Sequence, residues 1–254
     1  MGVLERKTAI VTGGGSGIGR ATCLALADAG ADVAVWDVSS ESATVTVQKI
    51  LERGGKGFCV VGSVSEPEAV RGCFNDISSR WPTIDILVNN AGVSGNRPTL
   101  ELSDEEWHRA VSINLDGVFF CSREAGRRMQ LSGGGRIVNL GSIYSVVAAP
   151  NRLSYCASKA GVAMMTKSLA IEWADLGINV NCVAPGYVDT PLIHELAADG
   201  RINLPALQDR TPQKRLALPE EIADAILYFC EPRSAHITGQ VLCVDGGWTA
   251  YGYI

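Results

Sequence analysis

The sequence predicts an α/β fold in which one doubly wound parallel sheet of about seven strands is flanked by helices. Short apolar runs rich in Val and Ile alternate with longer segments of helical period, which is typical of this class. The runs are almost continuously hydrophobic, as expected of strands buried on both faces of a parallel sheet. A chain of 254 residues, 46% of them hydrophobic, can bury such a core as a single domain over 1–254.

Seven segments are predicted to be strands, because each is rich in β-branched residues and ends in turn residues. They are 8–14, 31–37, 57–64, 84–92, 135–142, 178–186 and 239–247. Six segments between them have helical period, and these are 17–29, 41–53, 67–80, 104–131, 154–176 and 219–231. Two of the helices begin with start signals: a Ser or Asp followed by acids in "SDEEW", and a Pro followed by two Glu in "LPEEI".

The segment 187–218 differs from the rest of the chain. It is long and rich in Pro and polar residues, with only one short helical stretch around "PLIHELAADG". Because loops of this length inside a compact domain usually serve a function, this segment is predicted to be a substrate lid.

The composition argues against several classes of function. Net charge is −5 and the basic residues form no stripe or tail, so nucleic-acid binding is not expected. The eight cysteines include no C-x-x-C pair and form no cluster with the histidines, so no metal is expected. No apolar run approaches the ~20 residues that span a bilayer, and the N-terminus lacks a signal pattern, which together predict a cytoplasmic protein away from membranes.

The stretch "TGGGSGIG" (12–19) follows the first predicted strand and opens the first predicted helix. Glycines in this context let backbone N–H groups approach a pyrophosphate at a helix N-terminus. The spacing of Gly13, Gly17 and Gly19 is G-x-x-x-G-x-G, with one residue more than G-x-G-x-x-G, so the turn is wider. A purely structural tight turn is the rival interpretation.

Asp37 ends the second predicted strand, 18 residues after Gly19. Dinucleotide-binding folds place an acid here to accept hydrogen bonds from the adenosine ribose. A carboxylate also repels a 2′-phosphate, and neither Trp36 nor Val38 beside it is basic. The glycine loop and Asp37 together therefore predict an NAD cofactor, favoured over NADP.

Tyr155 and Lys159 in "SYCASK" share one face of a predicted helix, because they are four residues apart. A phenol titrates near pH ~10, so it exchanges protons poorly at neutral pH unless a neighbouring cation lowers its pKa. The pair therefore indicates a proton-transfer site, although an ordinary helix face would also explain these residues taken alone.

Six motifs in this order resemble those of the classical short-chain dehydrogenase/reductase family. They are "TGGGSGIG", "NNAG" at 89–92, Asn114 in "SINLDG", Ser142 in "LGSIYS", the Tyr155–Lys159 pair, and "PGYVDT" at 185–190. The resemblance covers essentially the whole chain. It implies a Rossmann-like fold, reversible oxidation of an alcohol to a carbonyl compound with NAD(P), and assembly as a homotetramer or homodimer.

The resemblance also implies roles for individual residues. Asn114, Ser142, Tyr155 and Lys159 match the catalytic tetrad: Tyr155 as general base or acid, Lys159 as the cation that lowers its pKa, Ser142 holding the substrate oxygen, and Asn114 holding a water. Alternative roles remain for two of them, a strand-end cap for Ser142 and a surface residue for Asn114. The cofactor positions are Gly13, Ser16, Gly17, Ile18, Gly19, Asp37, Ser63, Val64, Asn90, Ala91, Gly92, Tyr155, Lys159, Pro185, Gly186, Val188 and Thr190.

One position departs from the family pattern. Ser63 stands where the family commonly has an Asp that accepts from the adenine amino group, so a neutral hydroxyl is expected to contact adenine here. Tyr144, two residues after Ser142, lacks a Lys four residues later, so it is predicted to be a substrate-contact or core aromatic residue and not the base. The predicted substrate contacts are Ser142, Tyr144, Tyr155 and Tyr187.

The predicted function is hydride transfer between NAD(H) and a secondary alcohol or its ketone, with a polyol, a sugar acid or a similar hydroxy compound as substrate. The alternative is a 3-oxoacyl-[acyl-carrier-protein] reductase, a subgroup that generally uses NADPH and needs basic surface. Asp37 argues against the first requirement, whereas Arg123, Arg127 and Arg128 leave the second open. A nucleotide-sensing protein without catalysis is less consistent with an intact tetrad.

Overall fold

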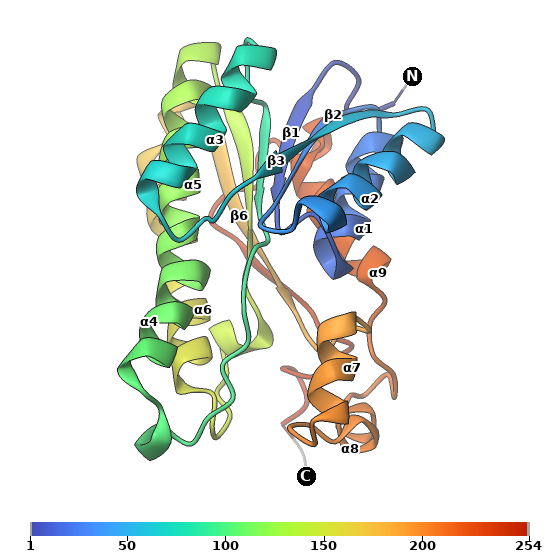
Figure 1. Ribbon diagram of the computed structural model, residues 1–254, viewed down its shortest axis with the longest axis vertical. Coiled ribbons are helices and arrows are strands. Elements are labelled where there is room, and N and C mark those ends of the chain that lie inside the picture. The colour runs from blue at the N-terminus through green and yellow to red at the C-terminus, as the bar shows by residue number, and fades with distance from the viewer. Residues whose placement is uncertain (1, 253–254) are drawn as a thin grey trace.

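Seven parallel strands form a single sheet in the computed structural model, which describes residues 2–252 (Figure 1). Their order across the sheet is β3-β2-β1-β4-β5-β6-β7. The strands are β1 (Thr8–Thr12), β2 (Asp32–Asp37), β3 (Lys56–Val61), β4 (Ile86–Asn89), β5 (Gly135–Leu140), β6 (Ile178–Pro185) and β7 (Val241–Val244). The predicted fold class is confirmed, although each strand is shorter than its predicted range because the flanking turn residues leave the ladder. Residues 1, 253 and 254 of the predicted domain lie outside the described residues.

Helices cover both faces of the sheet. One face carries α1 (Gly17–Asp28), α2 (Ser40–Glu52) and α9 (Pro219–Cys230). The opposite face carries α3 (Pro67–Arg80), α4 (Asp104–Val111), α5 (Gly117–Met129) and α6 (Leu153–Glu172), as Figure 1 shows. Two shorter helices, α7 (Pro191–Ala198) and α8 (Leu204–Arg210), lie beyond the sheet, at the bottom of the view in Figure 1. None of the described helices combines the length and apolarity that crossing a bilayer requires.

Successive residues of each strand supply the two cores, because strand side chains alternate between the faces of a sheet. In β1, Ala9 and Val11 pack in the core under α1 and α9, whereas Ile10 packs in the core under α3 and α5. All three side chains are fully buried. This two-sided burial explains why the strands are hydrophobic without interruption.

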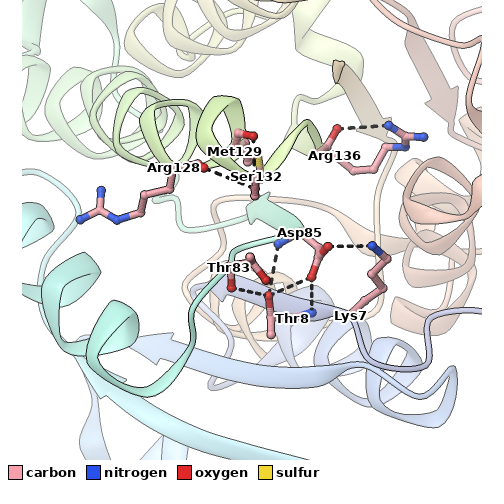
Figure 2. A network of polar contacts seen from close by, with 9 residues as sticks. Lys7, Thr8, Thr83, Asp85, Arg128, Met129, Ser132 and Arg136 are labelled. Atoms are coloured by element: carbon pink, nitrogen blue, oxygen red, sulfur yellow. Dashed lines mark hydrogen bonds and ion pairs between the residues drawn. The ribbon is translucent and has the colours of Figure 1, made fainter. Parts of the chain in front are cut away.

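The chain reverses its direction of winding between β1 and β4, which are neighbours in the sheet. At the amino ends of these strands, Asp85 accepts from the Thr8 N–H at 3.0 Å and from the Lys7 ammonium at 2.8 Å. The Thr8 hydroxyl donates to the Thr83 carbonyl at 2.9 Å (Figure 2). These contacts hold the two central strands in register at the end of the sheet that lies away from the ligand crevice expected at a switch point.

Two predictions about helices are wrong in detail. The predicted helix 104–131 is interrupted by a π-helical turn over Ser112–Asp116, which separates α4 from α5. The predicted lid contains two helices, α7 and α8, where only one short helical stretch was expected. The predicted Ser cap of α4 is confirmed, since the Ser103 hydroxyl and the Glu106 side chain form a reciprocal capping box.

Candidate active site

A cavity of about 510 Å³ lies at the carboxyl ends of the strands. It is lined by residues that follow β1, β2, β3, β4, β5 and β6, together with residues of α6 and α7. Every residue predicted to bind the cofactor or contact the substrate lines this cavity. Of the predicted tetrad, Ser142, Tyr155 and Lys159 line it, whereas Asn114 lies behind its wall.

The glycine loop forms a cradle that side chains would fill. Gly13 and Gly17 have φ values of +64° and +50°, a left-handed conformation that favours glycine. A Cβ on Gly19 would lie 2.0 Å from the Gly13 carbonyl oxygen. The N-cap residue of α1, Ser16, makes no side-chain cap, so no hydroxyl competes for the first N–H groups of the helix. The loop and the start of α1 therefore fit a pyrophosphate.

Asp37 is held at the end of β2 by two backbone groups. Its Oδ2 accepts from the Gly15 N–H and its Oδ1 from the Ser39 N–H, both at 2.9 Å. A carboxylate has about four acceptor sites, so it can still accept from ribose hydroxyls. Arg20, which lies near this loop, donates to the Gly15 carbonyl and to Thr46 and does not line the cavity.

Ser63 and Val64 lie beside Asp37 in the cavity wall, as predicted for residues near adenine. The Ser63 hydroxyl is 2.8 Å from the Ser65 hydroxyl and accepts from the Ser65 N–H at 3.2 Å. Because a hydroxyl has two acceptor sites and one donor, Ser63 keeps one acceptor site when it donates to Ser65. It can therefore still accept one hydrogen bond from a ligand.

Burial controls the protonation of the Tyr155–Lys159 pair. Burial raises the pKa of the Tyr155 phenol, and the Ser142 hydroxyl and the Arg152 charge act against this rise. Burial also lowers the pKa of the Lys159 ammonium to about 8. The Lys159 side chain is only 4% exposed, and its Nζ donates to the Leu140 carbonyl at 2.8 Å.

The expected electrostatic partnership of Lys159 with Tyr155 needs correction. Lys159 Nζ lies 5.7 Å from the centroid of the Tyr155 ring, as the four-residue spacing predicts. However, the pKa of Tyr155 is raised rather than lowered, and the groups that act against the rise are Ser142 and Arg152. The physical reason is that removing the phenol from water penalises its anion more than these neighbours stabilise it.

Asn114 is fully buried inside the π-helical turn, which excludes a surface role. Its Oδ1 accepts from the Val93 N–H at 2.8 Å, and its Nδ2 donates to the Val93 carbonyl at 2.9 Å and to the Ser158 hydroxyl at 3.3 Å. Asn114 therefore connects Val93, in the segment after β4, to Ser158 of α6, and Ser158 immediately precedes Lys159 in the chain. A Cβ on Gly92 would lie 3.1 Å from Asn114 Oδ1 and 3.7 Å from Lys159 Nζ, so this wall is closely packed.

The other end of the cavity combines aromatic, aliphatic and cationic side chains. The Tyr144 and Tyr187 hydroxyls are 2.7 Å apart, and the Tyr144 ring packs edge-on to the Tyr155 ring at 6.1 Å between centroids. The first turns of α7, within the predicted lid, contribute Leu192, Ile193 and Leu196. The lid segment therefore lines the cavity where a substrate would lie against Tyr155.

Lining residues that were not named individually from the sequence include Arg109, Ile113 and Arg152. Arg109 and Ile113 are four residues apart in the predicted helix 104–131 and so share one face, but neither has the three- or four-residue spacing to Asn114 that would have indicated it. Arg152 lies three residues before Tyr155. Helical spacing from Tyr155 could have indicated it, although it lies just before the first residue of α6.

Comparison with known proteins agrees with this geometry. A family model described as enoyl-(acyl carrier protein) reductase matches residues 13–249. A cis-4-hydroxycyclohexanecarboxylate dehydrogenase of Sinomonas cyclohexanicum is 41% identical over 96% of this chain and 97% of its own length. A 3-oxoacyl-[acyl-carrier-protein] reductase of Synechocystis is 37% identical over 99% of this chain and 100% of its own.

A solved structure extends the comparison to three dimensions. The crystal structure of a gluconate 5-dehydrogenase from Burkholderia cenocepacia, in complex with NADP and tartrate, has a TM-score of 0.92 and 35% identity, covering 98% of this chain and 97% of that one. Fold, cavity and relatives define an oxidoreductase that uses a nicotinamide cofactor to interconvert hydroxy compounds and their carbonyl forms. The chain belongs to the short-chain dehydrogenase/reductase family.

Proposed function

We propose that this chain is an NAD-dependent dehydrogenase that interconverts a secondary alcohol and its ketone. The observation that carries the proposal is the shared cavity: Tyr155, Ser142 and Lys159 line the same space as the glycine cradle and Asp37. A proton-transfer group and a dinucleotide cradle in one cavity are what hydride transfer to and from a carbinol requires.

The residues that fit the cofactor are distributed along the cavity. The glycine loop and the start of α1 take the pyrophosphate, Asp37 the adenosine ribose, and Ser63 with Val64 the adenine. The remaining cofactor positions are Asn90, Ala91, Gly92, Pro185, Gly186, Val188 and Thr190. When bound, the nicotinamide ring accepts or supplies the hydride.

The protein's own residues handle the proton and orient the substrate. The Tyr155 phenolate takes the hydroxyl proton of the alcohol in oxidation, and the phenol returns a proton to the carbonyl oxygen in reduction. The Ser142 hydroxyl donates to the same substrate oxygen and holds it against Tyr155. The Lys159 ammonium supplies a donor for the nicotinamide ribose. Asn114 holds the chain around Lys159 in place and orders a water there.

NAD is favoured over NADP because Asp37 is a fixed anion where a 2′-phosphate would lie. Its two backbone hydrogen bonds prevent the carboxylate from turning away without leaving two N–H groups unpaired. The related gluconate 5-dehydrogenase was solved with NADP, so the family alone does not decide the cofactor. The local geometry at Asp37 supports NAD.

The substrate class follows from the cavity and from the relatives. The aliphatic side chains of α7 suit the apolar part of a substrate's carbon skeleton, such as a ring or short chain. Two similar proteins are named for hydroxy acids, 4-hydroxycyclohexanecarboxylate and gluconate. A sugar acid or a similar hydroxy compound is therefore the preferred substrate, ahead of a neutral polyol.

A 3-oxoacyl-[acyl-carrier-protein] reductase is the second candidate, because one relative of 37% identity has that name. The arginines that could have supplied the basic surface for a carrier protein already contact other side chains of this chain. Arg127 and Arg128 pair with the buried Glu124 at 2.8 and 2.9 Å, and Arg123 stacks on Phe119 at 4.7 Å. These contacts reduce the free positive charge available to an acidic carrier protein.

Assembly and location complete the proposal. Apolar side chains are exposed on α5, α6 and β7, among them Phe119, Met164, Ile171 and Leu242, and burying them between copies supports a homotetramer or homodimer. All eight cysteines are free thiols, which supports the reducing cytoplasm as the location.

The test is a screen that follows the NADH absorbance band with NAD and with NADP. The substrates are 4-hydroxycyclohexanecarboxylate, gluconate, cyclohexanol and, in reverse, a 3-oxoacyl thioester. Asp37→Ala is expected to shift the ratio of kcat/KM values toward NADP, because it removes the repulsive anion. Asp32→Ala, at the opposite end of the same strand, is the control and should leave the ratio unchanged. Equal ratios in the wild type and the Asp37 variant would contradict the NAD assignment, and no turnover of any alcohol would contradict the function.

A further inference from the structure

The guanidinium of Arg152 lies beside the reactive phenol at the substrate end of the cavity. Arg152 lines the cavity just before α6, and its Cζ lies 5.4 Å from the centroid of the Tyr144 ring. The Tyr144 ring in turn packs edge-on to the Tyr155 ring. The charge of Arg152 also acts on Tyr155, where it opposes the rise in pKa caused by burial. Arg152 and Tyr155 therefore border the same part of the cavity.

Within residues 2–252, the Arg152 guanidinium has no carboxylate within ion-pair distance and no hydrogen-bond acceptor. Other arginines are paired: Arg97 with Glu106 at 2.9 Å, and Arg215 with Glu221 at 2.6 Å. Among the described residues that line the cavity, Asp37 is the one acid, and it lies at the adenosine end. The substrate end thus has a half-buried cation whose five donors are free for a ligand.

A planar guanidinium in this setting is suited to a carboxylate. Its fork of N–H groups matches the two oxygens of a carboxylate in a bidentate pair. The contact between the Arg152 guanidinium and the Tyr144 ring limits where the guanidinium can lie before any ligand arrives, so less freedom is lost when an anion binds. A neutral substrate would leave this cation partly desolvated and unpaired, which costs free energy.

Resting on the function proposed above, we propose that Arg152 binds the carboxylate of the substrate and makes the enzyme selective for hydroxy acids and keto acids. The carbinol or carbonyl carbon then lies at Tyr155 and Ser142, and the carboxylate at the Arg152 fork. Leu192 and Ile193 of α7 cover the carbon skeleton between them. The substrate class is therefore an aliphatic or alicyclic hydroxy acid, and Arg152 is a specificity-determining residue.

The first test measures binding without turnover. Isothermal titration of the enzyme saturated with NADH uses cyclohexanecarboxylate and its neutral amide, cyclohexanecarboxamide, as probes. The acid is expected to bind the wild type more tightly than the amide does. Arg152→Gln should raise the Kd of the acid by about 10- to 100-fold, which is the range for a lost hydrogen bond to a charged group. Arg152→Lys, which keeps the charge but not the fork, should give an intermediate loss. Arg71→Gln, which removes the same charge from the exposed face of α3, is the control and should bind like the wild type.

The second test measures reduction of 4-oxocyclohexanecarboxylate and of its methyl ester, which differ in charge at one group. Arg152→Gln should lower kcat/KM for the acid by about 10- to 100-fold and for the ester by less than about 3-fold. Equal losses for both ketones would show that Arg152 acts through the charge of Tyr155, and would overturn the proposal. Equal binding of the acid to the wild type and Arg152→Gln would also overturn it. Absence of reduction of both ketones and of every alcohol in the screen, with binding still dependent on Arg152, would refute the dehydrogenase function while supporting the carboxylate site.

Discussion

Replacing Lys159 with methionine is expected to change how the stability of the protein depends on pH. The Lys159 ammonium is buried, and its pKa falls from 10.5 to about 8 on folding. Between these two pH values the unfolded chain keeps a proton on Lys159 that the folded chain has released. Stability rises with pH wherever the unfolded state binds more protons, so Lys159 makes the wild type more stable as pH rises from 8 to 10.5.

The size of the effect follows from the same values. At about 1.4 kcal/mol for each pKa unit, the fall in the Lys159 pKa corresponds to roughly 3 kcal/mol. This is the free-energy cost of burying the ammonium at neutral pH, and the cost disappears once the side chain has lost its proton. Methionine has a similar length and does not titrate. It also loses the hydrogen bond to the Leu140 carbonyl, and the part of this loss that depends on the ammonium charge is already contained in the pKa of Lys159. The difference in unfolding free energy between wild type and variant should therefore grow by roughly 3 kcal/mol in favour of the wild type across this window.

The assay is urea denaturation of both proteins without cofactor, at matched protein concentration, in buffers below pH 8, within the window and near pH 10.5. Groups that titrate in the window and do not interact with Lys159 contribute equally to both proteins and cancel in the difference; the exception is the Cys182 thiol, whose pKa the Lys159 charge lowers. Parallel pH profiles would refute the reasoning, because they would mean that Lys159 titrates alike in the folded and unfolded chains.

Three further predictions concern the proton-transfer group and the sheet. Tyr155→Phe should lower turnover by about 10²- to 10⁴-fold while NADH binding, followed by fluorescence titration, stays close to wild type; a variant with more than about a hundredth of the wild-type rate would contradict the general acid–base role. Ser142→Ala should move the rising limb of the pH profile for alcohol oxidation to higher pH, because the Ser142 hydroxyl lowers the pKa of Tyr155 and the base must be deprotonated; a fall in rate with no movement of the limb would mean that Ser142 only positions the substrate. Asp85→Ala should lower the unfolding free energy by about 1–3 kcal/mol, because it leaves backbone and side-chain donors without their acceptor. Asp28→Ala, which breaks the exposed pair with Arg53, should cost about 0–1 kcal/mol, and equal losses for the two would argue against the Asp85 network.

The sequence was sufficient to predict what depends on local pattern. Continuous apolar runs indicated the buried strands, and polar or glycine residues just after them indicated the cavity wall, because parallel strands present their carboxyl ends at one edge. Asp37, Ser63 and Ser142 line the cavity for this reason.

What could not be predicted depends on three-dimensional packing. The π-helical turn at Asn114 spans only five residues inside a longer helical segment, which is too short for a change of period to show in the sequence. The pKa of Tyr155 depends on how completely it is removed from water, which the spacing to Lys159 does not determine. The role of Arg152 depends on the absence of an acid opposite it, and only the folded cavity shows which side chains face it.

Contacts that stabilise the fold and contacts that select the substrate lie at opposite ends of the strands. The Asp85 network lies at the amino ends of β1 and β4, whereas Arg152 lies beyond the carboxyl ends. A six-residue strand such as β5 separates these ends by about 16–20 Å, and the two sets of side chains share no partner. Changes at such separated sites add independently. Substitutions in the loops around Arg152 can therefore change which substrate binds without weakening the Asp85 contacts that stabilise the fold. The carboxyl end of the sheet is thus where evolution or redesign can change the selectivity of the enzyme at the least cost in stability.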